Sequence, residues 1–321
     1  MPHPFGASTL SAFVPARNRT KASTMPSRFP GVLTPLVTPF TEEGGLDLAA
    51  VGAVVEHQLA NGINGFVVAG TTGEGYALDA AERAAMLRTV RDLTAGRVPV
   101  LVGVGGMATR ESVAQAVAAA DGGADGLMVA GPAYVLPDQQ ELARHVRTVV
   151  DAVALPTVLY DYPARSGVQF GPEALDGLAD HPLVVGIKEA SGDLDRIAMM
   201  QQRYGDAIAL VSGADALAMH FFAAGSDSWI AGFANALPAE HVAMLTAASA
   251  GDLDHGWALS RRLDPILTWV ESGHYTAKCR AALELRGLHV GPPRPPLTAL
   301  AGDELATLRT LLTELLPELH G

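Results

Sequence analysis

The sequence has little of what several protein classes need. It contains one cysteine, Cys279, so an intrachain disulfide is impossible, and a reducing, cytoplasmic location is the simple expectation. No run of 18 or more apolar residues is present, which predicts that no segment spans a membrane. The ten histidines show no paired spacing typical of a metal site. The net charge of −12 argues against a nucleic-acid partner, which normally needs a basic face. We therefore expect no metal, no membrane and no nucleic acid.

The composition otherwise favours a large hydrophobic core. Hydrophobic residues make up 49% of the 321 residues but aromatic residues only 6%, so the core must consist mainly of Ala, Val and Leu. This length suits two domains, or one α/β barrel with an appendage. Residues 1–29 stand apart because they are rich in Ser, Thr, Pro and Arg and contain no acidic residue. We interpret them as a disordered or mis-called leader, with Met25 as the preferred start and a transit peptide as the alternative.

From Val32 onward, short β-branched runs alternate with longer amphipathic runs. The predicted strands are Val32 to Thr38, Gly65 to Ala69, Val98 to Gly103, Gly126 to Ala130, Pro156 to Tyr160, Val184 to Glu189, Ile208 to Ser212 and Ser228 to Ala231. The predicted helices between them open at Asp47, Asp79, Thr109, Asp138, Pro172, Asp193, Asp215 and Pro238, and six of these eight residues are typical N-caps.

Eight such units predict a (β/α)8 TIM barrel over residues 30–251. A doubly wound open sheet is the alternative, but Gly103 to Gly106 lacks the third glycine of a dinucleotide fingerprint. Three further helical patterns follow at Leu253 to Glu271, Tyr275 to Leu285 and Gly302 to Leu319. Residues 252–321 are therefore predicted to form a C-terminal helical subdomain.

Lys188 is the strongest candidate for a catalytic residue. It ends a short buried strand, and the chain has only three lysines among its 22 basic residues. A lysine can lose its proton and act as a nucleophile, whereas an arginine cannot. The structural alternative is a lysine that reaches the solvent from the strand end or pairs with Glu189.

In a barrel, functional groups gather at the C-terminal ends of the strands. The second strand ends in Gly70 to Gly75, a Gly-rich turn that presents backbone N–H groups and two hydroxyls to an anion. Tyr160 ends the fifth strand and can transfer protons, while Arg165 can bind a carboxylate with two hydrogen bonds. Tyr134 adds a hydroxyl after the fourth strand. Each of these also has an ordinary structural explanation, as a turn, a core tyrosine or a surface arginine.

Three motifs occur in order at the predicted strand ends: Gly70-Thr71-Thr72-Gly73-Glu74, Tyr160 before Pro163, and Gly186-Ile187-Lys188-Glu189-Ala190-Ser191-Gly192. Together they resemble the dihydrodipicolinate synthase / N-acetylneuraminate lyase family of Schiff-base enzymes. The resemblance implies that Lys188 forms an imine with pyruvate or another 2-oxo acid, and no cofactor is needed. Its amine must be neutral to attack, so its pKa must fall from about 10.4 to near 7.

The resemblance also implies roles for the other residues. The backbone of Thr71 and Thr72 holds the pyruvate carboxylate, and Tyr160 relays protons through Thr72 to Tyr134. A neighbouring subunit supplies Tyr134, which makes a homo-oligomer, a dimer or tetramer, part of the site. Gly213 and Ile230 are further substrate-binding positions by the same resemblance.

The substrate is less defined than the chemistry. Arg165 favours a synthase that condenses pyruvate with aspartate semialdehyde, since the resemblance gives this arginine the second carboxylate. Ala133, Tyr162 and Trp229 depart from that pattern and keep open a 2-keto-3-deoxy sugar-acid aldolase or dehydratase, or an N-acetylneuraminate lyase-like enzyme. Trp229 reshapes the pocket if it points inward and packs on a helix if outward. A non-catalytic barrel that binds a 2-oxo acid is the remoter alternative.

Overall fold

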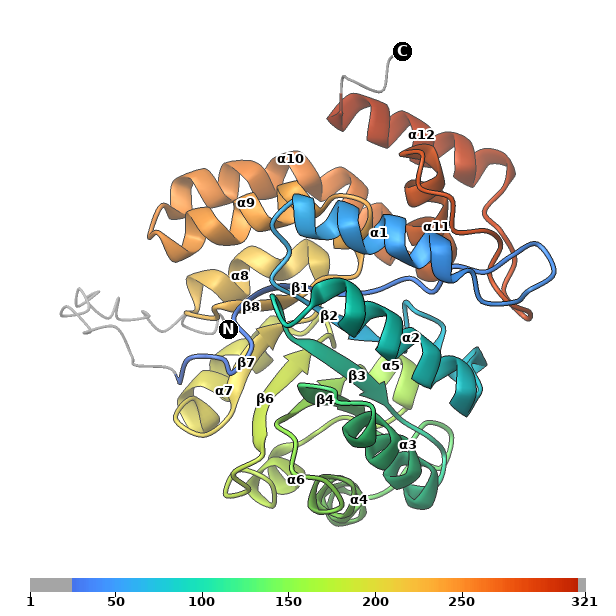
Figure 1. The fold of residues 1–321 in the computed structure, drawn as a ribbon. Helices are drawn as coiled ribbons and strands as arrows, with labels where there is room; N and C mark the ends of the chain where they lie inside the picture. The colour runs from blue at the N-terminus through green and yellow to red at the C-terminus, as the bar shows by residue number, and fades with distance from the viewer. Residues whose placement is uncertain (1–24, 317–321) are drawn as a thin grey trace, which may run out of the picture.

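The computed structural model describes residues 25–316, and eight parallel strands form a closed barrel at its centre (Figure 1). Each strand pairs with the next in sequence, and β8 pairs with β1, so the (β/α)8 prediction is confirmed. The strands are β1 (Gly31–Pro35), β2 (Gly65–Val68), β3 (Val100–Val104), β4 (Gly126–Ala130), β5 (Thr157–Asp161), β6 (Val184–Glu189), β7 (Ala209–Ser212) and β8 (Ser228–Ile230).

Helices connect the strands and cover the outside of the barrel (Figure 1). They are α1 (Leu48–Ala60), α2 (Ala80–Thr94), α3 (Thr109–Asp121), α4 (Gln139–Asp151), α5 (Pro163–Ser166), α6 (Pro172–Asp176), α7 (Leu194–Tyr204), α8 (Ala218–Ala223) and α9 (Pro238–Ser249), with short 3-10 turns η1 (Gly75–Ala77), η2 (Asp215–Leu217) and η3 (Phe233–Asn235).

Four of the six predicted N-cap residues cap a helix in the structure. The side chains of Asp47, Asp79, Asp138 and Asp193 each accept a hydrogen bond from a backbone N–H of the first turn. The prediction is wrong for the other two. Thr109 is the first residue inside α3, and Asp215 lies inside η2, where its carboxylate binds distant donors instead. The Asp215 carboxylate therefore does not cap a helix and instead accepts hydrogen bonds from Trp229 and Tyr275.

Hydrophobic side chains fill the barrel interior as a separate cluster from the layer between strands and helices. Leu33, Val67, Leu101, Met128 and Val158 belong to it. Phe29 joins this cluster at 6% exposure, and its carbonyl accepts a hydrogen bond from the Ser228 hydroxyl at 2.7 Å. Phe29, the last residue of the predicted leader, therefore packs inside the barrel. Residues 1–24 of the leader lie outside the described residues.

Three C-terminal helices lie together on one side of the barrel, next to α9 (Figure 1). They are α10 (Leu253–Glu271), α11 (Tyr275–Leu285) and α12 (Gly302–Leu315). The first two have the predicted bounds, and the third ends four residues before the predicted Leu319, which lies outside the described residues. Glu271 of α10 and Tyr275 of α11 also line a cavity at the C-terminal ends of the strands.

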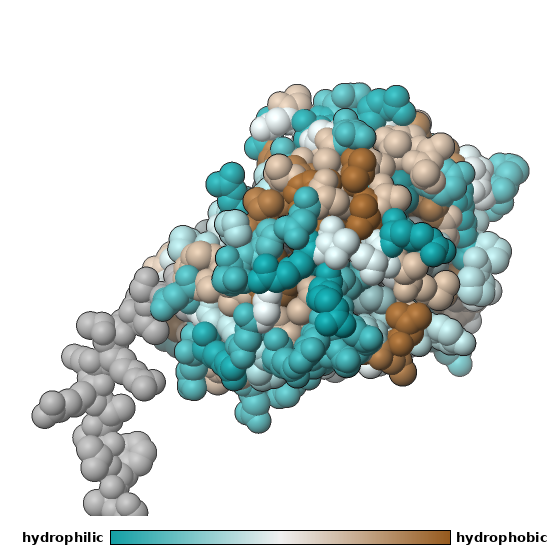
Figure 2. Space-filling model, turned by 90° about the horizontal axis from the view of Figure 1, so that it is seen from below, coloured by the Kyte–Doolittle hydropathy of each residue, from teal (hydrophilic) through white to brown (hydrophobic). Residues whose placement is uncertain are grey.

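The surface carries hydrophobic side chains scattered among hydrophilic ones, as Figure 2 shows for the face seen from below. The large exposed ones include Met107, Tyr134, Val135 and Leu136, in the loops that follow β3 and β4. Within residues 25–316, no helix has the length and apolar character needed to cross a membrane.

Candidate active site

Lys188 lies at the C-terminal end of β6, on the wall of a cavity of about 220 Å³. Its side chain is buried, and its Nζ atom lies 4.3 Å from the centroid of the Tyr160 ring. The same cavity, here called the Lys188 cavity, is lined by Thr71, Thr72, Tyr160, Tyr162, Arg165, Ala190, Ser191, Gly192, Gly213, Ala214, Leu217, Gly232, Glu271 and Tyr275. The fold thus brings the end of β6 together with the ends of β2, β5 and β7.

Burial lowers the pKa of Lys188 to about 8, because an ammonium loses its hydration in this apolar position. This pKa is higher than the value near 7 predicted from the sequence. The negative charges of Asp215 and Glu271, neither of which was assigned to the site, offset part of the burial effect. A substantial fraction of the amine is therefore uncharged at a pH slightly above neutral.

Tyr160 is the partner of Lys188 in the register between β5 and β6. Burial raises the pKa of Tyr160 to about 12, so its phenol stays protonated near neutral pH. The side chain that hydrogen bonds to Tyr160 is Thr71, whereas the sequence analysis placed this link at Thr72. Thr71 and Thr72 both line the Lys188 cavity, and Thr72 is the more buried of the two.

The turn after β2 is held tightly by its backbone. Glu74 N donates to Thr71 O at 3.1 Å, Gly75 N donates to Gly70 O at 3.0 Å, and Glu74 adopts a left-handed φ of 52°. A Cβ at Gly75 would lie 2.0 Å from the Ala69 carbonyl oxygen, so only glycine fits there. This geometry holds Thr71 and Thr72 at the wall of the Lys188 cavity.

Arg196 of α7 connects the two strands that carry Tyr160 and Lys188. Its Nε donates to Glu189 at 2.5 Å, and its guanidinium also binds Asp161 and the Phe170 carbonyl oxygen. Asp161 and Glu189 are the residues directly after Tyr160 and Lys188. All three charged side chains are buried, and burial raises the pKa of Asp161 to about 7 despite the nearby arginine. The arginine fixes the ends of β5 and β6 to each other.

Asp215, Glu271 and Tyr275 form an acidic cluster at the Lys188 cavity that the sequence analysis missed. The Tyr275 hydroxyl donates to Asp215 at 2.5 Å, and Glu271 accepts a hydrogen bond from the Asp215 backbone N–H at 2.6 Å. Burial of its carboxyl group and the Asp215 charge raise the pKa of Glu271 to about 7. Asp215 follows β7 and could have been recognised as a strand-end residue. Glu271 and Tyr275 come from α10 and α11, which a list of strand ends does not include.

Trp229 points outward from β8. Its ring is fully buried against Phe222 and His241, with ring centroids 5.5 and 4.5 Å away, and its Nε1 donates to Asp215 at 3.1 Å. The indole therefore leaves the pocket unobstructed and contributes to it only by orienting Asp215.

The remaining predicted residues divide into two groups. Arg165, on the short α5, lines the Lys188 cavity and a neighbouring cavity of about 370 Å³, and Gly213 lines the first. Ile230 belongs to the packed barrel interior and lines neither cavity. Tyr134 is 86% exposed in the single chain and also lines neither cavity. The structure thus gathers Lys188, Tyr160, Thr71, Thr72, Arg165 and Gly213, but not Ile230 or Tyr134.

This arrangement has the parts that carbonyl chemistry on an amine needs. A lysine with a lowered pKa can attack a ketone, a protonated phenol beside it can donate a proton, and the turn offers N–H groups to a carboxylate. Among the described residues, no group of three or more His, Cys, Asp and Glu side chains is placed to hold a metal ion.

Comparison with known proteins agrees with this fold. The model of the dihydrodipicolinate synthetase family matches residues 28–315. A 4-hydroxy-tetrahydrodipicolinate synthase of Acidothermus cellulolyticus is 36% identical over 287 residues, which is 89% of this chain and 92% of that protein. The synthase of Pseudomonas aeruginosa is 37% identical over 273 residues, 84% of this chain and 93% of that protein.

Solved structures show the same likeness. The crystal structure of dihydrodipicolinate synthase from Aquifex aeolicus superposes with a TM-score of 0.86 at 30% identity, covering 89% of this chain and 98% of that one. The molecule is therefore a (β/α)8-barrel lyase of the class I aldolase type. The chain belongs to the dihydrodipicolinate synthetase family.

Proposed function

We propose that the protein forms an imine between Lys188 and pyruvate and condenses it with aspartate semialdehyde, as a 4-hydroxy-tetrahydrodipicolinate synthase does. The observation that carries the proposal is the buried amine of Lys188, with a pKa of about 8, beside Tyr160 and the turn of Thr71 and Thr72. Family membership and the names of the relatives at 36 and 37% identity support the substrates.

The chemistry follows from the residues around the cavity. The neutral amine of Lys188 adds to C2 of pyruvate, the carbonyl oxygen is protonated and leaves as water, and an iminium forms. Loss of a C3 proton gives an enamine, whose C3 attacks the aldehyde carbon while the aldehyde oxygen takes up a proton. Tyr160 is positioned to move these protons. The amino group of the aldehyde substrate then replaces Lys188 at C2, which closes the ring and frees the lysine.

Substrate anchoring divides between two parts of the site. The N–H groups of the Thr71–Thr72 turn hold the pyruvate carboxylate, close to Lys188. Arg165 lies at the junction of the Lys188 cavity and its neighbour, where it can bind the carboxylate of the second substrate. Its guanidinium lies 5.5 Å from the Tyr162 ring centroid, a contact that restricts its position.

A 2-keto-3-deoxy sugar-acid aldolase or dehydratase is the second candidate. The outward orientation of Trp229 removes one reason for it. Tyr162 and Ala133 remain, because both line the cavity of about 370 Å³ next to Lys188 and so affect the size and shape of the second substrate. The case for an N-acetylneuraminate lyase-like activity rests on the same two residues.

Borohydride reduction in the presence of pyruvate tests the imine. We expect one reduced adduct, on the peptide that contains Lys188, and its loss in Lys188→Arg. Lys278→Arg is the matched control, because Lys278 is also buried but donates to the Trp269 carbonyl oxygen and the Ser272 hydroxyl, away from the Lys188 cavity. Absence of any adduct with pyruvate and other 2-oxo acids, together with retained ligand binding by Lys188→Arg, would favour a barrel that only binds.

Arg165→Ala separates the two enzymatic candidates. In the synthase, this change should reduce kcat/KM for aspartate semialdehyde by about 100-fold or more, because a charged group loses its bidentate partner, while pyruvate trapping stays intact. If wild-type protein traps pyruvate but never consumes aspartate semialdehyde, the sugar-acid candidate takes its place.

The proposed assembly is a homo-oligomer in the cytoplasm. Tyr134 has a left-handed φ of 73° and projects into solvent beside Val135 and Leu136, which are also exposed. Such a group of exposed apolar side chains fits a contact with a second copy of the chain. In that contact, the Tyr134 hydroxyl of one subunit completes the proton relay of the next.

A further inference from the structure

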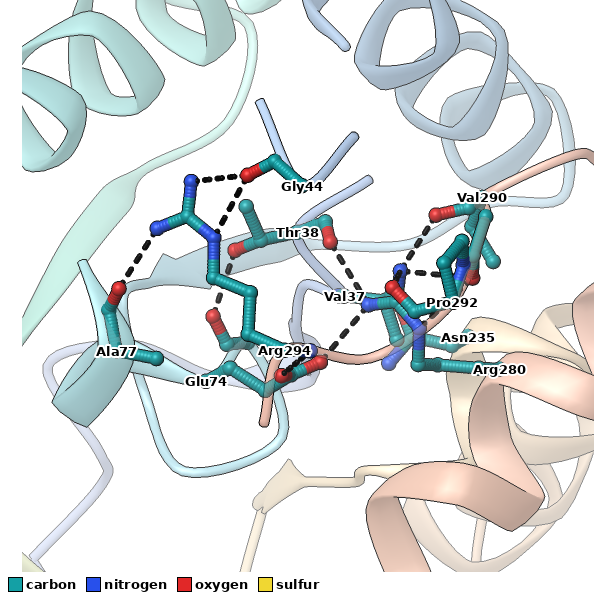
Figure 3. Close-up of polar contacts among 12 residues, drawn as sticks. Val37, Thr38, Gly44, Glu74, Ala77, Asn235, Arg280, Val290, Pro292 and Arg294 are labelled. Carbon is teal, nitrogen blue, oxygen red and sulfur yellow. Dashed lines mark hydrogen bonds and ion pairs between the residues drawn. The ribbon is translucent and has the colours of Figure 1, made fainter. Parts of the chain in front are cut away.

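Glu74, the last residue of the Gly70–Glu74 motif, is fully buried and bound by the C-terminal helical region (Figure 3). One carboxylate oxygen accepts a hydrogen bond from Arg280 Nη1 at 2.9 Å, and the other accepts one from the Arg294 backbone N–H at 2.9 Å. Arg280 belongs to α11 and Arg294 to the segment after it, both more than 200 residues away in sequence. The motif at the active-site turn is therefore anchored from outside the barrel.

Arg280 is itself a buried, fully engaged side chain. At 2% exposure, it donates hydrogen bonds to a set of backbone carbonyl oxygens as well as to Glu74 (Figure 3). Those carbonyls belong to Thr38, Val290, Gly291 and Pro292. Arg280 thus ties the loop after β1, the turn after β2 and the chain after α11 to one guanidinium.

Because Glu74 has an unusual backbone conformation, its bonds to the C-terminal region affect the geometry of the turn. Glu74 adopts a left-handed φ of 52°, which a non-glycine residue keeps only when its surroundings hold it. Its backbone N–H donates to the Thr71 carbonyl oxygen, so the two ends of the turn are directly linked. Burial raises the pKa of Glu74 and the charge of Arg280 lowers it, so the arginine offsets part of the cost of burying this carboxylate.

We propose that Arg280 is a positioning residue for the active site: through Glu74 it holds the turn that presents Thr71 and Thr72 to the carboxylate of the 2-oxo acid. The proposal rests on the proposed function of that turn. Arg280 does not touch the substrate, and its effect passes through the left-handed residue that closes the turn. The C-terminal region then contributes to substrate binding as well as to packing.

The chain offers a matched control for the test. The Arg294 side chain also joins the C-terminal region to the barrel, through Glu82, Gly44 and Ala77, but only its backbone N–H reaches Glu74. Arg294→Met removes a partly exposed ion pair between the same two regions and keeps that N–H. We expect Arg280→Met to raise the KM for pyruvate by about tenfold or more, because a small displacement of an anchoring group costs much activity, and Arg294→Met to change it by less than about twofold.

Two further variants keep the test decisive if Arg280→Met folds poorly. Arg280→Lys retains the charge and should restore much of the pyruvate affinity. Glu74→Gln combined with Arg280→Met removes the unpaired buried charge, so it should fold and still show a raised KM. Hydrogen exchange at the amides of residues 71–75 should be faster in Arg280→Met and in the double variant than in wild type and in Arg294→Met, whether or not pyruvate is a substrate.

The outcomes separate the two proposals. An unchanged KM for pyruvate and unchanged exchange at residues 71–75 in folded Arg280 variants would overturn the positioning role. Equal effects of Arg280→Met and Arg294→Met would also overturn it, because they would show loss of stability alone. Failure of wild-type protein to trap pyruvate would refute the proposed function, and the exchange comparison would still decide whether Arg280 holds the turn.

Discussion

Lys188 and Tyr160 face each other across β6 and β5: they are register partners, and the Nζ atom lies 4.3 Å from the ring centroid. The face of an aromatic ring favours a cation, so this contact alone would keep the lysine charged. Burial has the larger effect, and the pKa of Lys188 falls to about 8. The pair therefore combines an amine that loses its proton readily with a phenol that keeps its own.

Imine formation should depend on pH in the direction set by Lys188. Only the neutral amine attacks pyruvate, and its fraction rises with pH through a pKa of about 8. We expect the rate of pyruvate trapping to increase about tenfold per pH unit well below pH 8 and to level off above it. Initial rates measured between pH 6 and pH 10 will show this, and a midpoint near the ordinary lysine value of about 10.4 would contradict the assignment.

Replacement of Lys188 by methionine should stabilise the folded protein while abolishing activity. The folded-state pKa of about 8 lies below the unfolded value, so the protonated lysine destabilises the fold fully below pH 8, and this effect fades between pH 8 and about 10.4. The difference between a pKa of about 8 and one of about 10.4 corresponds to about 3 kcal/mol in the free energy of unfolding at pH 7. Urea unfolding of both proteins at pH 7 and again near pH 10 should show a gain at the lower pH that shrinks at the higher.

Arg196 should be essential to the folded barrel. Its removal leaves the buried carboxylates of Asp161 and Glu189 without their cation, so Arg196→Met should lower the free energy of unfolding by about 3–5 kcal/mol. Arg203→Met is the control on the same helix, because Arg203 pairs with Asp176 at the surface and such pairs contribute only about 0–1 kcal/mol. Comparable losses in the two variants, measured by urea unfolding, would show that the buried cluster has no special role.

The charge of Glu271 should affect the pH dependence of pyruvate trapping by Lys188. Glu271 helps to keep the lysine protonated, so Glu271→Gln should move the midpoint of pyruvate trapping below pH 8, while the amide oxygen can still accept from the Asp215 N–H. Glu314→Gln, an exposed change on α12, should leave the midpoint in place. A midpoint that stays fixed or rises in Glu271→Gln would show that the carboxylate does not act on the amine.

The barrel was predictable because each strand–helix unit has its own local sequence pattern. The bounds of β4, β6, α10 and α11 agree with the predicted ranges, since β-branched runs and helical periodicity extend across each of them. The four residues of α5 are too few to show any periodicity, and this helix was missed. Fold prediction thus succeeded where the signal lies within one element.

The site was predictable only where its residues sit at strand ends. Lys188, Tyr160 and Arg165 were found in this way. The role of Asp215 depends on donors from Trp229 and Tyr275, which are 14 and 60 residues away, and no local pattern encodes such partners. The same reason explains the missed anchor of Glu74, whose partners lie in the C-terminal region.

The outward orientation of Trp229 gives the protein an intrinsic optical reporter. Its indole N–H is bonded to Asp215, whose charge acts on Lys188, and the ring has no contact with water. The other two tryptophans, Trp257 and Trp269, both lie on α10 and can be replaced by phenylalanine. Fluorescence of the remaining indole should then follow occupancy of the Lys188 cavity in real time, without a label and without turnover.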